Sequence, residues 1–427
     1  MRAGGLRAWA ARMVGRGGPA QDPAPQDPLL RLAHLLAEPP QQVAGLNTLS
    51  SQIDAQIRCN PGRAAHFLQT ALYAYGGPHS PLLDRLLIQT LDAQWRSQTS
   101  QADKGRALRR KLHLFETTYG TVPATKLYRG ALALRGGDRD AALDLQAQAA
   151  RDIGPSGMPW MHIGAHALRP GQQAEWLTPA ASAHVPGTQP CVDWYRQATI
   201  PGPITVLASG DSAFFRAYGL HLHAALRALD RAATLHVHIV NMTQACADII
   251  DTLAATDPAL SVSTEVYPHK DDRTYFACAR FYRLAEIRTQ LPQPAYIVDM
   301  DNVVTRAPVA ALPAFGAMDA AWHAHVSQTW FPWWGPTAFN TYIAAGQGGD
   351  RIARWMQAYL ATRLHPGDFF KSWWIDQLML NEIAEVAPHH GLRTTTSRVH
   401  ALTLTEPMPD RQRLPIRAAF LANDFAG

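Results

Sequence analysis

The 427-residue sequence contains few cysteines and few lysines, and it lacks any long apolar run. Its four cysteines form no Cys-x-x-Cys pair, which argues against a zinc ribbon and against a scaffold built on disulfides. No stretch reaches the ~20 apolar residues that a membrane-spanning helix needs. We therefore expect a protein of a reducing compartment, the cytoplasm, without a transmembrane segment.

Charged residues are also scarce, and the positive ones are nearly all arginine. Asp, Glu, Lys and Arg make up 17% of the chain, whereas 47% is hydrophobic, which is enough to build packed cores. The 39 basic residues comprise five Lys and 34 Arg, and the net charge is only +5. Arginine suits bidentate binding of phosphate and carboxylate. No basic run is dense enough to predict binding of nucleic acid.

The length and the changes in residue pattern predict two domains. Residues 1–28, which end in a Pro- and Gln-rich stretch, predict a disordered tail. Arg interrupts every apolar stretch that could serve as a secretory signal, and the lack of acids in residues 1–18 leaves an organellar transit peptide as the alternative. Residues 29–153 show helical periodicity broken by Gly-rich turns, which fits a tetratricopeptide-like (TPR-like) unit or a plain helical bundle. These helices offer a surface for a protein partner. Residues 154–202 are rich in Pro, Gly and Ala and predict a linker that partly packs on its neighbours.

Residues 203–427 have the alternating pattern of an α/β domain. Helical stripes separate short apolar strands, which are expected at 204–209, 235–240, 260–266 and 295–298. This order predicts a mainly parallel, Rossmann-type sheet with flanking helices and right-handed crossovers. Ligands of such sheets bind beyond the carboxyl ends of the strands, so the loops after Ser209 and Val298 are the first candidates for a site.

The strongest chemical feature is the Asp299-Met300-Asp301 motif, which follows the last of these strands. Two carboxylates two residues apart project to the same side of an extended chain. Hard divalent cations prefer carboxylate oxygens, so Asp299 and Asp301 are candidate ligands of Mn²⁺ or Mg²⁺. Such a cation would offset charge on a diphosphate leaving group. The alternative is a strand-end turn in which the Asp side chains bond locally.

A second feature is a pair of tryptophans, Trp373 and Trp374, directly before the polar start of an expected helix. Asp376 and Gln377 lie in the first turn of an expected helix, where the helix dipole favours an acid. Aromatic walls suit the apolar face of a sugar ring. Candidate acceptor contacts are therefore Trp333, Trp334, Trp373 and Trp374. The alternatives are a core role for the tryptophans and a simple helix-end charge for Asp376.

Together, the two motifs resemble the nucleotide-sugar glycosyltransferases of the GT-A fold, especially family 8 and its relatives. The resemblance covers residues 203–427 and implies metal-dependent transfer of a sugar from a nucleoside diphosphate sugar, preferably a UDP-sugar, to a hydroxyl of a glycan or other acceptor. It implies that Asp299 and Asp301 hold the metal and that Asp376 and Gln377 orient sugar and acceptor. Family 8 relatives retain configuration; an inverting enzyme would need a general base, for which Asp376 is the candidate.

The resemblance also implies donor contacts. The family's first strand ends in a small residue and an Asp near an aromatic, which here correspond to Ser209, Asp211 and Phe215 and would border the nucleotide. The helix before the Asp-x-Asp strand carries a Tyr-x-Arg-Leu-like element, matched here by Arg283, with Arg280 one turn earlier. Both arginines would bind the donor. The alternative is that they pair with surface carboxylates.

The C-terminal end departs from the family pattern. Relatives supply a third metal ligand from a His near the C-terminus, followed by a Lys-Pro-Trp that clamps the diphosphate. In this sequence Asp424 stands in place of the His, with His400 as a rival, and the Lys-Pro-Trp is missing. Lys371 and Arg273 are candidates to replace the clamp and bind the donor. The alternative for Lys371 is a solvated side chain.

Two other functions fit parts of the sequence. The segment from Asp299 to Val303 matches the Asp-x-Asp-x-Val element of haloacid-dehalogenase-type phosphatases, whose first Asp is the nucleophile. That family places the element on its first strand and needs a later Lys and a further acidic pair, whereas here three strands precede it and Lys371 is the only later Lys. The other alternative is a helical-repeat interaction protein with an inactive transferase-like domain, against which the intact acidic motifs argue.

Overall fold

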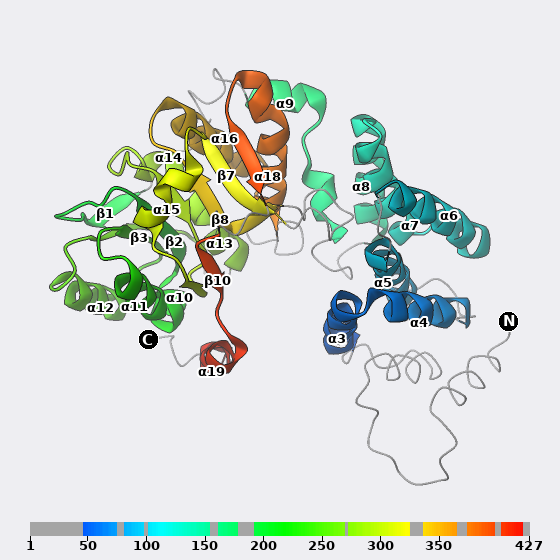
Figure 1. Cartoon of the computed structure of the whole chain (residues 1–427), viewed down its shortest axis with the longest axis horizontal. Coiled ribbons are helices and arrows are strands. Elements are labelled where there is room, and N and C mark those ends of the chain that lie inside the picture. Colours follow the sequence, from blue (N-terminus) through cyan, green and yellow to red (C-terminus); the bar gives the residue numbers. More distant parts are fainter. Residues whose placement is uncertain are drawn as a thin grey trace, which may run out of the picture. The chain divides into compact units, whose positions relative to one another are not determined.

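The computed structural model describes residues 46–74, 81–97, 101–153, 161–177, 192–269, 272–324, 336–364, 374–397 and 403–421. They fall into two compact units, one ending at residue 153 and one starting at residue 161 (Figure 1). The tail predicted at 1–28 lies outside these ranges. None of the described helices combines the length and apolar character that crossing a membrane requires.

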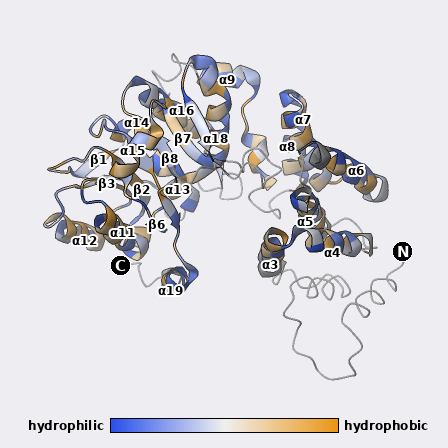
Figure 2. Ribbon diagram, in the orientation of Figure 1, coloured by the Kyte–Doolittle hydropathy of each residue, from blue (hydrophilic) through white to orange (hydrophobic). Residues whose placement is uncertain are grey.

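The N-terminal unit is all-helical, as the periodicity predicts. Its helices are α3 (Leu46–Cys59), α4 (Pro61–Ala74), α5 (Pro81–Ser97), α6 (Gln101–Tyr119), α7 (Pro123–Arg135) and α8 (Arg139–Ile153). The Asp84 carboxylate accepts a hydrogen bond from the Ala124 N–H (3.1 Å), and the Tyr128 hydroxyl donates to the Ile88 carbonyl (3.0 Å), so α5 and α7 are packed together. Hydropathy alternates along these helices (Figure 2). Packed helices fit both a plain helical bundle and a TPR-like unit, so the TPR-like assignment stays a prediction.

The C-terminal unit is built on an eight-stranded sheet of order β1-β4-β3-β2-β5-β8-β7-β9. Its strands are β1 (Asp193–Arg196), β2 (Thr205–Asp211), β3 (Thr234–Val240), β4 (Leu260–Glu265), β5 (Ala295–Ile297), β7 (Ala320–Ala324), β8 (Pro336–Ile343) and β9 (Thr394–Ser397). Strands β2 to β5 are parallel, whereas β1 and β8 run antiparallel to their neighbours. The predicted parallel sheet is confirmed for β2 to β5, and the whole sheet is mixed.

Helices cover the sheet in two layers. On one face, Leu222 of α11 (Leu220–Leu229), Ile250 of α12 (Gln244–Ala254) and Phe315 of α15 (Pro308–Phe315) share an apolar cluster with strand residues such as Val237. The second layer contains helices that contact one another, α13 (Arg273–Tyr282), α16 (Gln347–Arg363) and α18 (Ile375–Val386). All seven residues of β3 are buried, as expected for a strand covered on both faces.

Shorter elements complete the unit. After β2 come the short helix α10 (Ser212–Phe214) and the π-helical turn η5 (Phe215–Gly219), and α14 (Leu284–Ile287) follows α13. The 3-10 turn η7 (Ala387–His390) follows α18, and α19 (Asp410–Leu421) is the last described helix. Strands β6 (Asn302–Val304) and β10 (Thr405–Pro407) form a separate two-stranded ribbon.

Part of the segment predicted as a linker belongs to the C-terminal unit. It contains the turn η3 (Ile163–His166), helix α9 (Pro170–Trp176) and the edge strand β1. The Gln173 side-chain amide donates to the buried Glu382 carboxylate of α18 (2.8 Å), and the Tyr359 hydroxyl donates to the His166 carbonyl (3.1 Å). These contacts join distant parts of the sequence and pack the described part of the segment on α16 and α18.

The strand order locates the expected ligand site. Strand β2 pairs with β3 on one side and with β5 on the other, so the chain leaves β2 in one direction and later returns along its other edge. Such a reversal opens a crevice between the carboxyl ends of the two strands, where ligands bind in open α/β sheets. In this protein that rule points to the region at the end of β2 and the Asp-x-Asp motif after β5.

Candidate functional site

The Asp299-Met300-Asp301 turn is fixed on both sides. The Val298 N–H donates to the Leu207 carbonyl (2.9 Å), which carries the pairing of β2 and β5 to the start of the motif. At its far end, the Met408 N–H donates to the Asp301 carbonyl (3.4 Å). Met300 is buried, whereas the two aspartates that flank it are partly exposed. The Asn302 N–H donates to the Asp299 carbonyl (3.1 Å), so the motif forms a turn and not the extended segment expected from the sequence; the charge of Asp299 still acts on Asp301.

The turn is also held from within the sheet by Asn340 of β8. Its side-chain carbonyl accepts hydrogen bonds from the Tyr296 hydroxyl of β5 (2.5 Å) and from the Thr405 N–H (3.1 Å), at the start of β10. Asn340 is buried, and these bonds join three strands around the motif. The carboxylates thus project from a rigid part of the fold, as a binding site requires.

The end of β2 packs closely on this turn. A Cβ added to Gly210 would lie 3.4 Å from Cε of Met300 and 3.1 Å from a ring carbon of Phe214, so a side chain here would crowd the motif. The Asp211 carboxylate caps α10 by accepting from the Phe214 N–H (2.7 Å), and burial raises its pKa. Phe215 is 1% exposed and packs in the core; its contact with a nucleotide stays a prediction.

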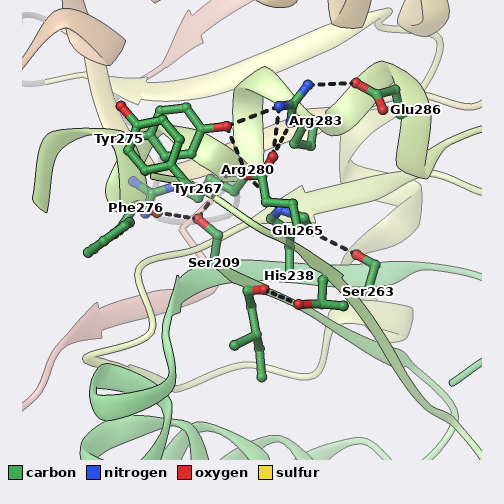
Figure 3. Close-up of polar contacts among 12 residues, drawn as sticks. Ser209, His238, Ser263, Glu265, Tyr267, Tyr275, Phe276, Arg280, Arg283 and Glu286 are labelled. Atoms are coloured by element: carbon green, nitrogen blue, oxygen red, sulfur yellow. Dashed lines mark hydrogen bonds and ion pairs between the residues drawn. The ribbon is translucent and has the colours of Figure 1, made fainter. Parts of the chain in front are cut away.

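Ser209 joins β2 to α13. Its hydroxyl donates to the Phe276 carbonyl (2.8 Å) and accepts from the Arg280 N–H (3.0 Å) (Figure 3). Because Ser209 is buried, its hydroxyl serves this internal bridge rather than the predicted contact with a nucleotide. The bridge fixes the backbone of Arg280 at the carboxyl end of the sheet.

Arg280 lies at the centre of the site. One of its terminal nitrogens, Nη2, lies 2.5 Å from Oδ1 of Asp299 and 3.6 Å from Oδ2 of Asp376. Its side chain is only 4% exposed, and within the described residues its buried Nε has no hydrogen-bond partner. The structure thus brings together three residues predicted to share the site, from α13, from the end of β5 and from the first turn of α18.

Asp301 and Asp376 are unusually easy to protonate. Burial raises the pKa of Asp376 to about 6; the Arg280 charge opposes this rise, and the Asp299 charge adds to it. Burial, followed by the charge of Asp299, raises the pKa of Asp301 to about 6, against the opposing charges of Arg280 and Arg413. Two carboxylates, those of Asp299 and Asp376, lie within 3.6 Å of the buried guanidinium, and its charge also acts on Asp301. The burial of Asp301 and Asp376 and the charge of Asp299 favour protonation of both groups.

The helix that carries Asp376 begins in an uncommon conformation. Trp374, directly before α18, has φ +68°, a left-handed backbone that side-chain-bearing residues rarely adopt. Such residues cost of order 1–3 kcal/mol and concentrate at ligand sites. Nothing in the sequence indicates this left-handed backbone at Trp374. Gln377 follows Asp376 in the first turn, and its N–H donates to the Asp376 carboxylate (2.8 Å).

Arg283 lies in a different cluster from Arg280. Its guanidinium donates to the carboxylates of Glu265 (2.7 Å) and Glu286 (3.0 Å) and to the Tyr275 hydroxyl (3.1 Å) (Figure 3). Burial alone would raise the pKa of Glu265, but His238 and Arg283 together lower it. The described structure uses Arg283 to neutralise this buried acid. Its contact with the donor stays a prediction.

The network around Glu265 was missed by the sequence analysis. The His238 ring bonds to Glu265 (3.1 Å) and to the Ser263 hydroxyl (2.9 Å), and His236 bonds to Ser261 (3.0 Å) and to Ser263 (2.9 Å). These polar residues alternate along β3 and β4 within strands that are otherwise apolar. Alternation on two neighbouring buried strands was the available signal for a polar network on one face of the sheet.

Several predicted residues cannot be placed in the site. The rival ligand His400 lies outside the described residues, and so do Lys371, Asp424, Trp333, Trp334 and Trp373. Trp322, which precedes this tryptophan-rich segment, is 1% exposed in β7 and packs inside the unit.

A divalent cation fits the carboxylates of the motif if a ligand completes its coordination. Asp299 and Asp301 offer oxygens of the preferred kind, and a cation would relieve the repulsion that raises the pKa of Asp301. In the part of the chain that the structure describes, no three His, Cys, Asp or Glu side chains are grouped to hold a metal. Mg²⁺ is commonly held by one or two carboxylates together with substrate phosphates and water.

No protein-family model and no curated protein sequence matches the chain. Among solved structures, the chain is similar to the apo structure of the WbbM bifunctional glycosyltransferase, with 12% identity and a TM-score of 0.29. The similarity covers 48% of this chain and 39% of that chain, so it spans well under half of the neighbour's length. A likeness this distant determines neither family nor activity, and the function has to be argued from the site.

Proposed function

We propose that the chain is a glycosyltransferase that moves a sugar from a nucleoside diphosphate sugar, preferably a UDP-sugar, to an acceptor hydroxyl, with Mn²⁺ or Mg²⁺ as cofactor. The observation that carries the proposal is the meeting of Asp299, Arg280 and Asp376 at the point where the strand order reverses. A pair of strand-end carboxylates beside a buried guanidinium suits a ligand that combines phosphate with hydroxyl groups.

Each residue has a task in this reaction. Asp299 and Asp301 hold the cation, and Asp424 is the proposed third ligand. The chemistry that a bound cation supplies is stabilisation of the departing diphosphate. Arg280 adds positive charge beside it and orients Asp299 and Asp376.

Asp376 and Gln377 orient the donor sugar and the acceptor. Burial and a pKa of about 6 suit Asp376 to hold or accept a proton near neutral pH. Retention of configuration rests on the resemblance to family 8 alone. Trp374 at the start of α18 is the proposed acceptor contact within the described residues, and Lys371, Trp333, Trp334 and Trp373 remain proposed contacts beyond them.

The first test is a binding titration with UDP, GDP and their sugars, with and without Mn²⁺. Asp301→Ala should abolish metal-dependent nucleotide binding, because it removes half of the carboxylate pair. Asp248→Ala, which removes an exposed carboxylate from α12, should bind as the wild type does. Absence of nucleotide binding together with hydrolysis of phosphate esters would instead support the phosphatase.

The geometry gives the phosphatase less support. A phosphatase of that type uses the first Asp of the motif as its nucleophile, whereas Asp299 forms an ion pair with Arg280. The parallel strands β2, β3 and β4 also precede the motif along the chain, which differs from the first-strand position of that family.

A further inference from the structure

Arg280 already forms an ion pair with Asp299, one of the two carboxylates that a metal would need. Its Nη2 lies 2.5 Å from Oδ1 of Asp299, and the guanidinium has little room to withdraw because it is almost completely buried. Its main chain is held by the Ser209 hydroxyl. A divalent cation bound to Asp299 would therefore lie close to a fixed positive charge that repels it.

Two buried donors of the same region lack partners. The Nε of Arg280 and the Nε of Arg413, on α19, are both buried without a hydrogen-bond partner in the described structure. Arg413 also forms an ion pair with Asp410, its side chain is 36% exposed, and its charge acts on Asp301. A phosphate-bearing anion beside the motif would interact with the positive charge of both guanidinium groups.

We propose that Arg280 makes binding of a divalent cation at Asp299 and Asp301 conditional on a diphosphate. Without the diphosphate, the guanidinium holds Asp299 and opposes the cation. A bound diphosphate supplies further oxygens for the cation and enough negative charge to accommodate both the cation and Arg280. This inference rests on the proposed function, and it makes metal and nucleotide mutually dependent ligands.

The test measures Mn²⁺ binding directly, from the electron paramagnetic resonance signal of free Mn²⁺, with and without saturating UDP. The wild type should bind Mn²⁺ weakly alone and at least about tenfold more tightly with UDP, within the range usual for coupling between ligands. Arg280→Gln should bind Mn²⁺ alone about tenfold more tightly than the wild type and show less coupling to UDP. Because coupling is reciprocal, Mn²⁺ should strengthen UDP binding by the same factor.

Two control variants distinguish loss of the Arg280 charge from a general disruption of the fold. Arg231→Gln removes an equal charge from an exposed turn directly before β3, and its Mn²⁺ affinity should stay within about twofold of the wild type. Arg280→Lys keeps the charge and should keep the weak affinity for Mn²⁺ alone. Circular dichroism and thermal unfolding check the fold of each variant.

The outcomes distinguish this inference from the proposed function. Tight Mn²⁺ binding by the wild type without UDP would overturn the inference whatever the variants do, and so would an Arg280→Gln variant that folds and binds Mn²⁺ no more tightly. Either result leaves the transferase proposal standing if Mn²⁺ and UDP still bind together. Failure of the wild type to bind any nucleotide with Mn²⁺ would overturn both.

Discussion

Arg280 and Arg283 lie one turn apart in sequence, yet they belong to clusters of opposite character. Arg283 donates to two carboxylates and a hydroxyl, and its acid Glu265 also accepts from His238 and Tyr275. Arg280 has one close carboxylate contact, a longer one to Asp376 and a buried donor without a described partner. The first cluster is saturated with hydrogen bonds, and the second has spare donors and excess negative charge.

The difference indicates which cluster stabilises the fold and which one can bind a ligand. A buried polar network whose members are all satisfied rigidifies the fold, whereas incomplete satisfaction leaves capacity for a ligand. The saturated cluster fixes α13 against β3 and β4, and the unsaturated one uses that fixed helix to present Arg280. We therefore expect substitutions in the Glu265 cluster to change stability and those in the Arg280 cluster to change activity.

The largest expected effect is on turnover. Asp376→Asn keeps the size of the side chain but removes its charge and its proton-accepting oxygen, so transfer should fall by about 10²–10⁴-fold. Its free energy of unfolding at pH 7 should be unchanged or higher, because the native environment disfavours the ionised acid. Transfer assays with the donor identified by titration, together with urea unfolding, provide the measurement. Unchanged turnover would remove Asp376 from the reaction.

The largest effect on stability should come from the saturated cluster. Arg283→Met leaves Glu265 charged, buried and without its cation, which should lower the free energy of unfolding by about 3–5 kcal/mol. Arg280→Met should cost less, because the Asp299 side chain is 33% exposed and water can solvate it. Urea unfolding of the C-terminal unit measures both. The reverse order would show that the two clusters have been assigned the wrong roles.

A smaller effect is a change of stability with pH that arises from the unsaturated cluster around Arg280. Asp376 has a native pKa of about 6 against an ordinary value of 3.8, so between these values the native state binds more protons than the unfolded state. Stability should therefore fall as the pH rises through this window, by about 3 kcal/mol at most from this group. Asp376→Asn should flatten the profile relative to the wild type. Identical profiles from pH 4 to 7 would contradict the raised pKa.

The sequence predicted those parts of the fold whose signal is local. The helical character of the N-terminal unit was predicted because apolar residues repeat at helical spacing between Gly-rich turns; α5 starts at Pro81 and α8 at Arg139. Strands β2 to β5 follow from short apolar runs. The antiparallel half of the sheet, the edge strand β1 and the docking of α9 depend on contacts between distant residues, which no local period encodes.

The same distinction applies to the candidate site. Asp299 and Asp376 could be singled out because motifs place them just beyond a strand and at a helix start. The direction of a side chain at a strand end was harder to predict, so Ser209 and Phe215 were assigned to a ligand although both point into the protein. The partners of Arg283 were missed because Glu265 lies 18 residues away on another element.

The smallest expected effect tests how closely the end of β2 must approach the Asp-x-Asp turn after β5. Gly210→Ala adds a methyl group 3.1 Å from Phe214 and 3.4 Å from Met300, so it should cost about 1 kcal/mol of stability and weaken UDP binding by shifting the motif. Gly62→Ala in α4 meets no atom within 4 Å and should instead stabilise its helix by about 0.4–1 kcal/mol. Unfolding and UDP titration of both variants make the comparison. If Gly210→Ala binds UDP as tightly as Gly62→Ala does, close packing of β2 against the Asp-x-Asp turn is not what sets the geometry of the carboxylates.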